Sequence, residues 1–195
     1  MAAAERPGYV KSWYAQSADP APAHPPLRGR ETADVVVLGA GLTGLSAALE
    51  LAEAGLSVVV LEAQRVGWGA SGRNGGQVIF GFGCDQPKIA AMVGMQESRR
   101  LFSWAVEGVQ MVRERMARHA IDADWQDGHA HVAIKPRHID ELKALQQDLA
   151  DNYAYPVQWW DREQLAAQLD SPRYLGAVFD PQSGVIKIDG MDIKG

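Results

Sequence analysis

A glycine-rich turn between an apolar strand and a helix is the feature that most constrains the fold of this chain. Residues 35–38 form a short β-branched run, as a buried parallel strand requires. Small and apolar residues recur at helical spacing over residues 45–52, and a second apolar strand follows over residues 56–61. This order of elements predicts one right-handed βαβ unit. The turn has the spacing G-x-G-x-x-G and comprises Gly39, Ala40, Gly41, Leu42, Thr43 and Gly44.

Each glycine of this turn has a physical role in dinucleotide binding. Gly39 permits the tight turn, Gly41 lets the backbone approach a pyrophosphate, and Gly44 lets the helix pack closely on the strand. The helix N-terminus offers free N–H groups and a positive dipole end to phosphates. Glu62, where the second strand ends, can accept hydrogen bonds from both ribose hydroxyls and would repel the 2′-phosphate of NADP. The unit therefore predicts a dinucleotide site but does not separate FAD from NAD.

The glycine-rich segment over residues 67–77 favours FAD. It follows the second strand closely and belongs to a stretch, residues 66–85, that is predicted to be a structured loop. Its Ser, Arg, Asn and Gln side chains could surround a flat polar ligand with hydrogen-bond donors. An NAD-dependent dehydrogenase would normally continue from this strand into another helical crossover. That dehydrogenase and a flexible glycine linker stay open as alternatives at this point.

The two glycine motifs together resemble those of a known family. Residues 35–62 followed by residues 67–77 are similar to the FAD-dependent D-amino-acid-oxidase-like superfamily. The string Val-Gly-Trp-Gly-Ala-Ser-Gly-Arg-Asn-Gly-Gly-Gln, at residues 66–77, most resembles the gamma-glutamylputrescine oxidases. The resemblance extends from about residue 10 to about residue 184, and it includes Ser12-Trp13-Tyr14, the Pro-Pro-Leu at residues 25–27 and Asp127-Gly128.

The resemblance implies an α/β fold, with a Rossmann-type FAD-binding βαβ unit and the start of an inserted mixed α+β substrate domain. It implies hydride transfer from the carbon next to a substrate amine to the flavin, with oxygen as acceptor. The expected partners are therefore FAD, a small amine or amino acid, and oxygen, and no catalytic residue is identified. Carried over by motif position, the expected FAD-binding residues are Gly39, Ala40, Gly41, Leu42, Thr43, Gly44, Glu62, Ala63, Ser71, Gly72, Arg73, Asn74, Gly75, Gly76 and Gln77.

Two features depart from the family pattern. Members are much longer, and their C-terminal half returns to complete the FAD site, so this chain is expected to be truncated and inactive by itself. After Ser183-Gly184, the atypical tail over residues 185–195 lacks the Pro that usually opens a helix. An inactive nucleotide-binding remnant is therefore a further alternative.

The remaining sequence predicts the domain organisation. We expect an N-terminal arm over residues 1–30, an FAD-binding domain over 31–120 and a partial substrate domain over 121–184. Helices are predicted over residues 96–119, 138–151 and 161–169, a hairpin or strand pair over 124–134, and a strand over 175–179. The Trp159-Trp160 pair is interpreted as packing.

Composition and charge exclude several classes of partner. The net charge is −5, from 24 acidic and 19 basic residues, so nucleic acid is not an expected partner. No long apolar run or signal peptide is evident, which predicts a cytoplasmic protein without a membrane span. Cys84 is the only cysteine, and His129 and His131 have no third ligand at matching spacing, so no metal site is expected. The oligomeric state is left open.

Overall fold

The computed structural model describes residues 8, 24–169 and 171–186. The described residues fall into two compact units that divide between Gly76 and Gln77, and each unit is described by itself. Most of the expected N-terminal arm, including Trp13 and Tyr14, lies outside the described residues, as does most of the tail after residue 185. The expected boundary between the FAD-binding and substrate domains, at residue 120, stays a prediction.

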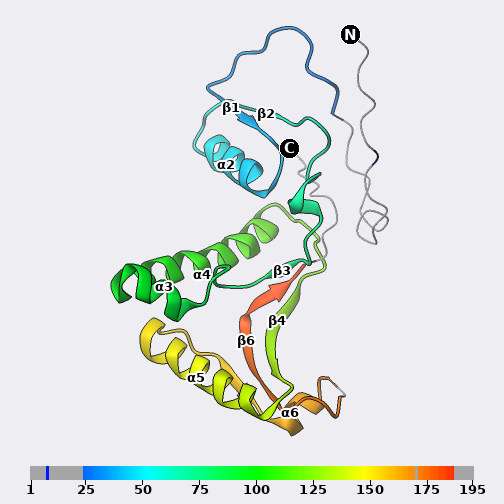
Figure 1. Cartoon of the computed structure of the whole chain (residues 1–195). Helices are drawn as coiled ribbons and strands as arrows, with labels where there is room; N and C mark the ends of the chain where they lie inside the picture. The colour runs from blue at the N-terminus through cyan, green and yellow to red at the C-terminus, as the bar shows by residue number, and fades with distance from the viewer. Residues whose placement is uncertain (1–7, 9–23, 170, 187–195) are drawn as a thin grey trace. The chain divides into compact units, whose positions relative to one another are not determined.

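The first unit contains the predicted βαβ arrangement. Strand β1 (Val35–Leu38) is followed by helix α2 (Leu42–Glu53) and strand β2 (Val58–Leu61), and the two strands pair in parallel (Figure 1). Side chains alternate along β1, so that Val36 and Leu38 are 54% and 80% exposed while Val35 and Val37 are half-buried. This alternation is that of a strand with one covered face.

A reciprocal pair of polar residues fixes the register where the two strands begin. The Asp34 N–H donates to Ser57 Oγ at 2.9 Å, and the Ser57 N–H donates back to Asp34 Oδ2 at 2.8 Å. The Ser57 hydroxyl donates to the same carboxylate oxygen at 2.6 Å. These bonds from the Ser57 side chain and backbone lower the pKa of Asp34.

The second unit is a four-stranded antiparallel sheet with helices. Strand β6 (Gly176–Val185) is central and pairs with β3 (Gln77–Val78), β4 (Gln126–Ala133) and β5 (Gln158–Trp160). Figure 1 shows α5 lying along the sheet next to β4 and β6. The helices of this unit are α3 (Gln86–Val93), α4 (Met95–Arg118), α5 (Pro136–Tyr153) and α6 (Arg162–Ala166).

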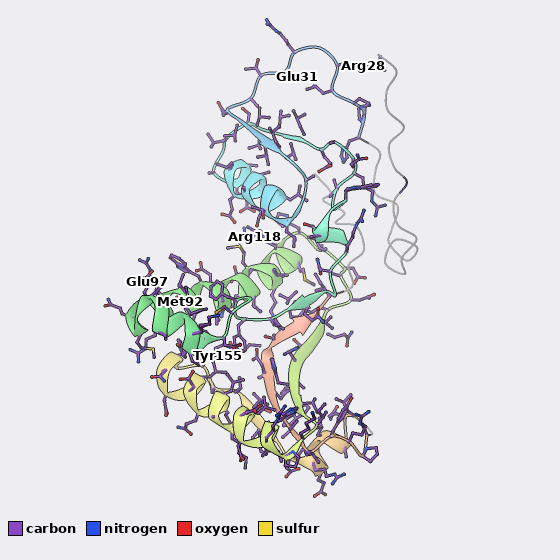
Figure 2. The ribbon with its side chains drawn as sticks, in the orientation of Figure 1. Arg28, Glu31, Met92, Glu97, Arg118 and Tyr155 are labelled. Carbon is purple, nitrogen blue, oxygen red and sulfur yellow. The ribbon has the colours of Figure 1, made fainter. Side chains whose placement is uncertain are left out.

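The core of the second unit joins two helices to the sheet. Phe102 of α4, Leu149 of α5 and Val178 of β6 are buried together with Tyr155. The ring of Phe80 packs on Phe102 and Tyr155, with centroids 5.3 and 4.8 Å apart. Figure 2 labels Tyr155 between the α3–α4 pair and α5, where these side chains meet. Burying such large apolar and aromatic side chains is what holds α4 and α5 to the sheet.

A buried carboxylate, on Asp180 of β6, adjoins this core. Asp180 is 3% exposed, and it accepts from the Tyr155 hydroxyl and the Gln182 N–H, both at 2.9 Å, and from the Ser183 hydroxyl. Burial raises the pKa of the Tyr155 hydroxyl, and the negative charge of Asp180 raises it further. Tyr155 therefore stays a hydrogen-bond donor to Asp180 across the ordinary pH range.

Gly94 separates the predicted helix from a preceding helix that the sequence analysis does not predict. The predicted helix over residues 96–119 is confirmed as α4, whose first turn follows Gly94 at φ +83°. The same glycine ends α3, for which the apolar periodicity predicts no element. Helix α3 starts with Pro87 in its first turn, where a missing N–H costs no hydrogen bond.

The expected hairpin around Gly128 is wrong. Residues 126–133 form the single strand β4, and its partner is the distant strand β6. Gly128 has φ +93°, and the pairing with β6 shifts register between Asp127 and His129. Gly128 therefore marks a bulge in one strand and not a turn between two.

Other expectations for this unit can be compared directly. Trp160 stacks on Phe179 of β6, with centroids 4.0 Å apart, and Lys143 lies over Trp159, which agrees with packing roles for both tryptophans. The rings of His129 and His131 lie 4.7 Å apart on β4, as strand alternation predicts. Burial lowers the pKa of His129, and the neighbouring His131 lowers it further.

Candidate cofactor site

The glycine turn between β1 and α2 adopts a geometry that only glycine allows. Gly39 has φ +102°, and its N–H donates to the Leu61 carbonyl at 2.8 Å. A Cβ on Gly44 would lie 2.1 Å from the Gly39 carbonyl oxygen, which is a backbone atom. The close approach of α2 to the end of β1 therefore depends on Gly44.

Gly41 makes room for a side chain from the second glycine motif. A Cβ on Gly41 would lie 3.0 Å from Ser71 Oγ. That same oxygen accepts from the N–H of Leu42, the first residue of α2, at 2.9 Å. The N-cap residue Gly41 has no side chain of its own to cap α2, so its first-turn N–H groups need other acceptors.

The segment over residues 67–76 is folded onto the glycine turn. The N–H of the buried Gly67 donates to the Ala40 carbonyl at 2.9 Å, and Ser71 contacts Leu42 as described. Within the segment, residues 70–72 form a short 3-10 turn. The segment is therefore a hydrogen-bonded loop with a defined conformation, and the alternative of a flexible linker does not fit it.

Glu62 joins the end of β2 to the same turn. Its Oε2 accepts from the Ala40 N–H and its Oε1 accepts from the Gln64 N–H, both at 2.8 Å. These backbone hydrogen bonds, Ala40 first, lower the pKa of Glu62, so the carboxylate is ionised at neutral pH. Because each carboxylate oxygen has two lone pairs, Glu62 can still accept two hydroxyl hydrogen bonds.

The polar side chains of the loop are directed largely at the loop itself. Arg73 Nε donates to the Trp68 carbonyl at 2.9 Å, and its guanidinium lies 5.4 Å from the Trp68 ring centroid. Asn74 Nδ2 donates to the carbonyls of Ala70 and Ser71, and its Oδ1 accepts from the Gly76 N–H. These contacts shape the loop before any ligand is considered.

The structure brings most of the expected site residues together, but not all. Residues 39–44, Glu62 and residues 71–74 are linked by the hydrogen bonds above, and the buried Gly76 is tied to Asn74. Ala63 is exposed directly after Glu62. Gln77 belongs to the second unit, where it pairs with Val185 of β6. Gly67 belongs to the glycine-rich segment that the sequence analysis describes, but it was not among the expected FAD-binding residues.

The residues present fit a dinucleotide with an unmodified ribose. The N-cap residue of α2 provides no side-chain cap, so N–H groups of the first turn can bind phosphate. The ionised carboxylate of Glu62, at the end of the adjoining strand, can accept hydrogen bonds from ribose hydroxyls. The βαβ unit with a second, folded glycine loop agrees with the flavoprotein that the sequence predicts. The chain belongs to the FAD dependent oxidoreductase family, whose sequence profile matches residues 34–190.

Named relatives agree with this family. The chain is 41% identical over 177 residues to the "Probable oxidoreductase OrdL" of Haemophilus influenzae, and 39% identical over 178 residues to the "Gamma-glutamylputrescine oxidoreductase" of Escherichia coli. These matches cover 90% and 91% of this chain, but 41% and 42% of the relatives. The chain therefore spans about two fifths of the length of the curated relatives it matches.

A solved structure agrees with the fold. An L-amino acid deaminase from Proteus vulgaris, solved without its specific insertion sequence, matches with a TM-score of 0.68 at 22% identity, covering 93% of this chain and 45% of that one. The cofactor of the family is FAD, which decides the choice between FAD and NAD that residues 39–62 leave open. Within residues 8, 24–169 and 171–186, no helix is long and apolar enough to cross a bilayer. The same residues place no three His, Cys, Asp or Glu side chains together as metal ligands.

Proposed function

We propose that this chain provides the adenosine-binding part of the FAD site, together with part of the substrate domain, of an amine or amino-acid oxidase. The observation that carries the proposal is the folding of the loop over residues 67–76 onto the glycine turn. That contact, through Gly67–Ala40 and Ser71–Leu42, builds one polar surface from the two motifs. The family and the relatives named above support the oxidase type.

Within this proposal, each part of the surface has a distinct role toward FAD. The N-terminus of α2 and the Ser71 hydroxyl bind the pyrophosphate, and Glu62 accepts the ribose hydroxyls. Residues 72–76 continue the site toward the flavin. FAD, when bound, supplies the acceptor for a hydride from the carbon next to the substrate amine, and oxygen is the proposed final acceptor. No residue of this chain is assigned a catalytic role.

The proposed substrate is a primary or secondary amine or an amino acid. One named relative acts, by its name, on gamma-glutamylputrescine, which makes that amine the first compound to test. The second unit is proposed to contribute part of the substrate domain, because its antiparallel sheet begins at Gln77, directly after the loop over residues 67–76.

The first test is cofactor binding by the purified chain. We expect FAD to bind with quenching of its fluorescence, NADH to bind much more weakly, and Gly41→Val to lower FAD affinity at least about tenfold. The valine side chain would displace Ser71 Oγ, because the first added carbon already lies 3.0 Å from it. Gly83→Val is the matched control, since a Cβ on Gly83 would meet nothing within 4 Å. Tight NADH binding without FAD binding would overturn the proposal.

A second prediction concerns turnover. The 195-residue chain by itself should release no measurable peroxide from amines, whereas a relative of full length should. Oxidation requires the substrate C–H within about 3–3.5 Å of flavin N5 in a water-excluded site. Most of the proposed contacts of this chain lie with the adenosine half of FAD. Peroxide release by the purified chain with gamma-glutamylputrescine would show this expectation to be wrong.

A further inference from the structure

We propose that Asn74 is a positioning residue, which acts on FAD binding only by holding Ser71 against the N-terminus of α2. The inference rests on the proposed function, and it changes the role that motif position suggests for Asn74. Motif position alone suggests that Asn74 contacts FAD. The hydrogen bonds of Asn74 point to a different role.

The donors of Asn74 are both used inside the loop. Nδ2 donates to the Ala70 carbonyl at 3.1 Å and to the Ser71 carbonyl at 3.0 Å. A primary amide has two donor hydrogens, so neither is left for another acceptor. Phosphate oxygens only accept hydrogen bonds, so Asn74 Nδ2 could bind the pyrophosphate of FAD only by breaking bonds within the loop.

The acceptor of Asn74 closes the other side of the same turn. Oδ1 accepts from the Gly76 N–H at 2.9 Å, so the side chain connects residues 70 and 71 to residue 76. The short turn is also closed by the Arg73 N–H, which donates to the Ala70 carbonyl at 3.1 Å. The hydrogen bond from Asn74 to the Ser71 carbonyl thereby fixes the backbone of Ser71.

Ser71 connects the loop held by Asn74 to the N-terminus of α2, where the pyrophosphate is proposed to bind. Its Oγ accepts from the Leu42 N–H at 2.9 Å, and a hydroxyl that accepts still has its one hydrogen to donate. The absence of a Cβ on Gly41 lets Oγ take this place, since such a carbon would lie 3.0 Å away. Asn74 therefore sets the position of a donor that can face an anionic phosphate at the positive end of α2.

The test is a double-mutant cycle on the full 195-residue chain, with FAD itself as the probe. Ser71→Ala and Asn74→Ala should each weaken FAD binding about tenfold or more, and the double variant should be within about twofold of Ser71→Ala. Such non-additivity is expected only when Asn74 acts through Ser71. Losses that multiply would show that Asn74 contacts FAD directly, and an unchanged affinity in Asn74→Ala would also overturn the inference.

A second readout needs no FAD. Hydrogen exchange at the Leu42 amide should speed up about tenfold in Asn74→Ala, and by the same factor in Ser71→Ala and in the double variant. Asn152→Ala is the control, because that side chain bonds to Asp148 in the second unit, and it should change neither readout. Unchanged Leu42 exchange in Asn74→Ala would refute the inference. If the native chain bound no FAD while Leu42 exchange responded as expected, the proposed function would fail and the positioning role would stand.

Discussion

Replacing Gly44 by alanine should unfold the glycine turn of the first unit and abolish FAD binding. The added Cβ would lie 2.1 Å from the Gly39 carbonyl oxygen and 3.3 Å from Val37 Cγ1. Neither the turn nor α2 can move away without breaking the Gly39–Leu61 and Leu45–Gly41 backbone hydrogen bonds. We expect a loss of about 3 kcal/mol in the free energy of unfolding of this unit, at the upper end of the cost of overpacking.

The measurement is hydrogen exchange of peptides that cover α2, with FAD titration in parallel. Gly108→Ala is the matched control, because it lies inside α4 and a Cβ there would meet nothing within 4 Å. That control should be neutral or stabilise by up to about 1 kcal/mol, as alanine favours the helix. Retained FAD binding and unchanged exchange in Gly44→Ala would contradict the close packing of α2 on the turn.

Replacing Asp180 by alanine should destabilise the second unit by about 3–5 kcal/mol, because three hydrogen-bond donors would lose their acceptor in a buried place. Those donors are the Tyr155 and Ser183 hydroxyls and the Gln182 N–H. Ser183 is fully buried and Tyr155 is nearly so, so water would not replace the lost bonds easily. Urea unfolding followed by far-UV circular dichroism measures the change.

Two further variants separate the carboxylate from its partners. Asp180→Asn keeps an acceptor oxygen and should cost clearly less than alanine. Tyr155→Phe removes one donor and leaves two bonds to Asp180, so we expect a loss of about 1–2 kcal/mol. Equal losses in all three variants would mean that the hydrogen bonds do not dominate.

Local sequence signals were enough to predict the first unit. Strand β1, helix α2 and strand β2 lie within a few residues of the predicted spans, since each is encoded by consecutive residues and the glycines between them. In the second unit, α4 and α5 were predicted from their apolar stripes. Strand β5 was missed, because its three residues become a strand only by pairing with β6, about twenty residues later. Gly128 was misread for the same reason, since the partner of β4 is not adjacent in sequence.

The candidate site divides along similar lines. Motif spacing predicted Gly39, Gly44 and Glu62, whose geometry follows from the βαβ unit. Which side chains of the loop turn outward could not be predicted, because that depends on hydrogen bonds such as Asn74–Ala70 that only the folded loop displays. The placement of Gln77 in the second unit likewise depends on its pairing with Val185.

That pairing has a consequence for how the chain can be altered. The second unit begins at Gln77 and its last strand ends at Val185, and these two residues are partners in the same sheet. The two ends of this segment are therefore neighbours in space. Segments with adjacent ends can be inserted, exchanged or removed as modules with little effect on the rest of the chain. A chimaera that exchanges residues 77–185 between relatives therefore has both of its splice points at one pair of neighbouring strand residues, Gln77 and Val185.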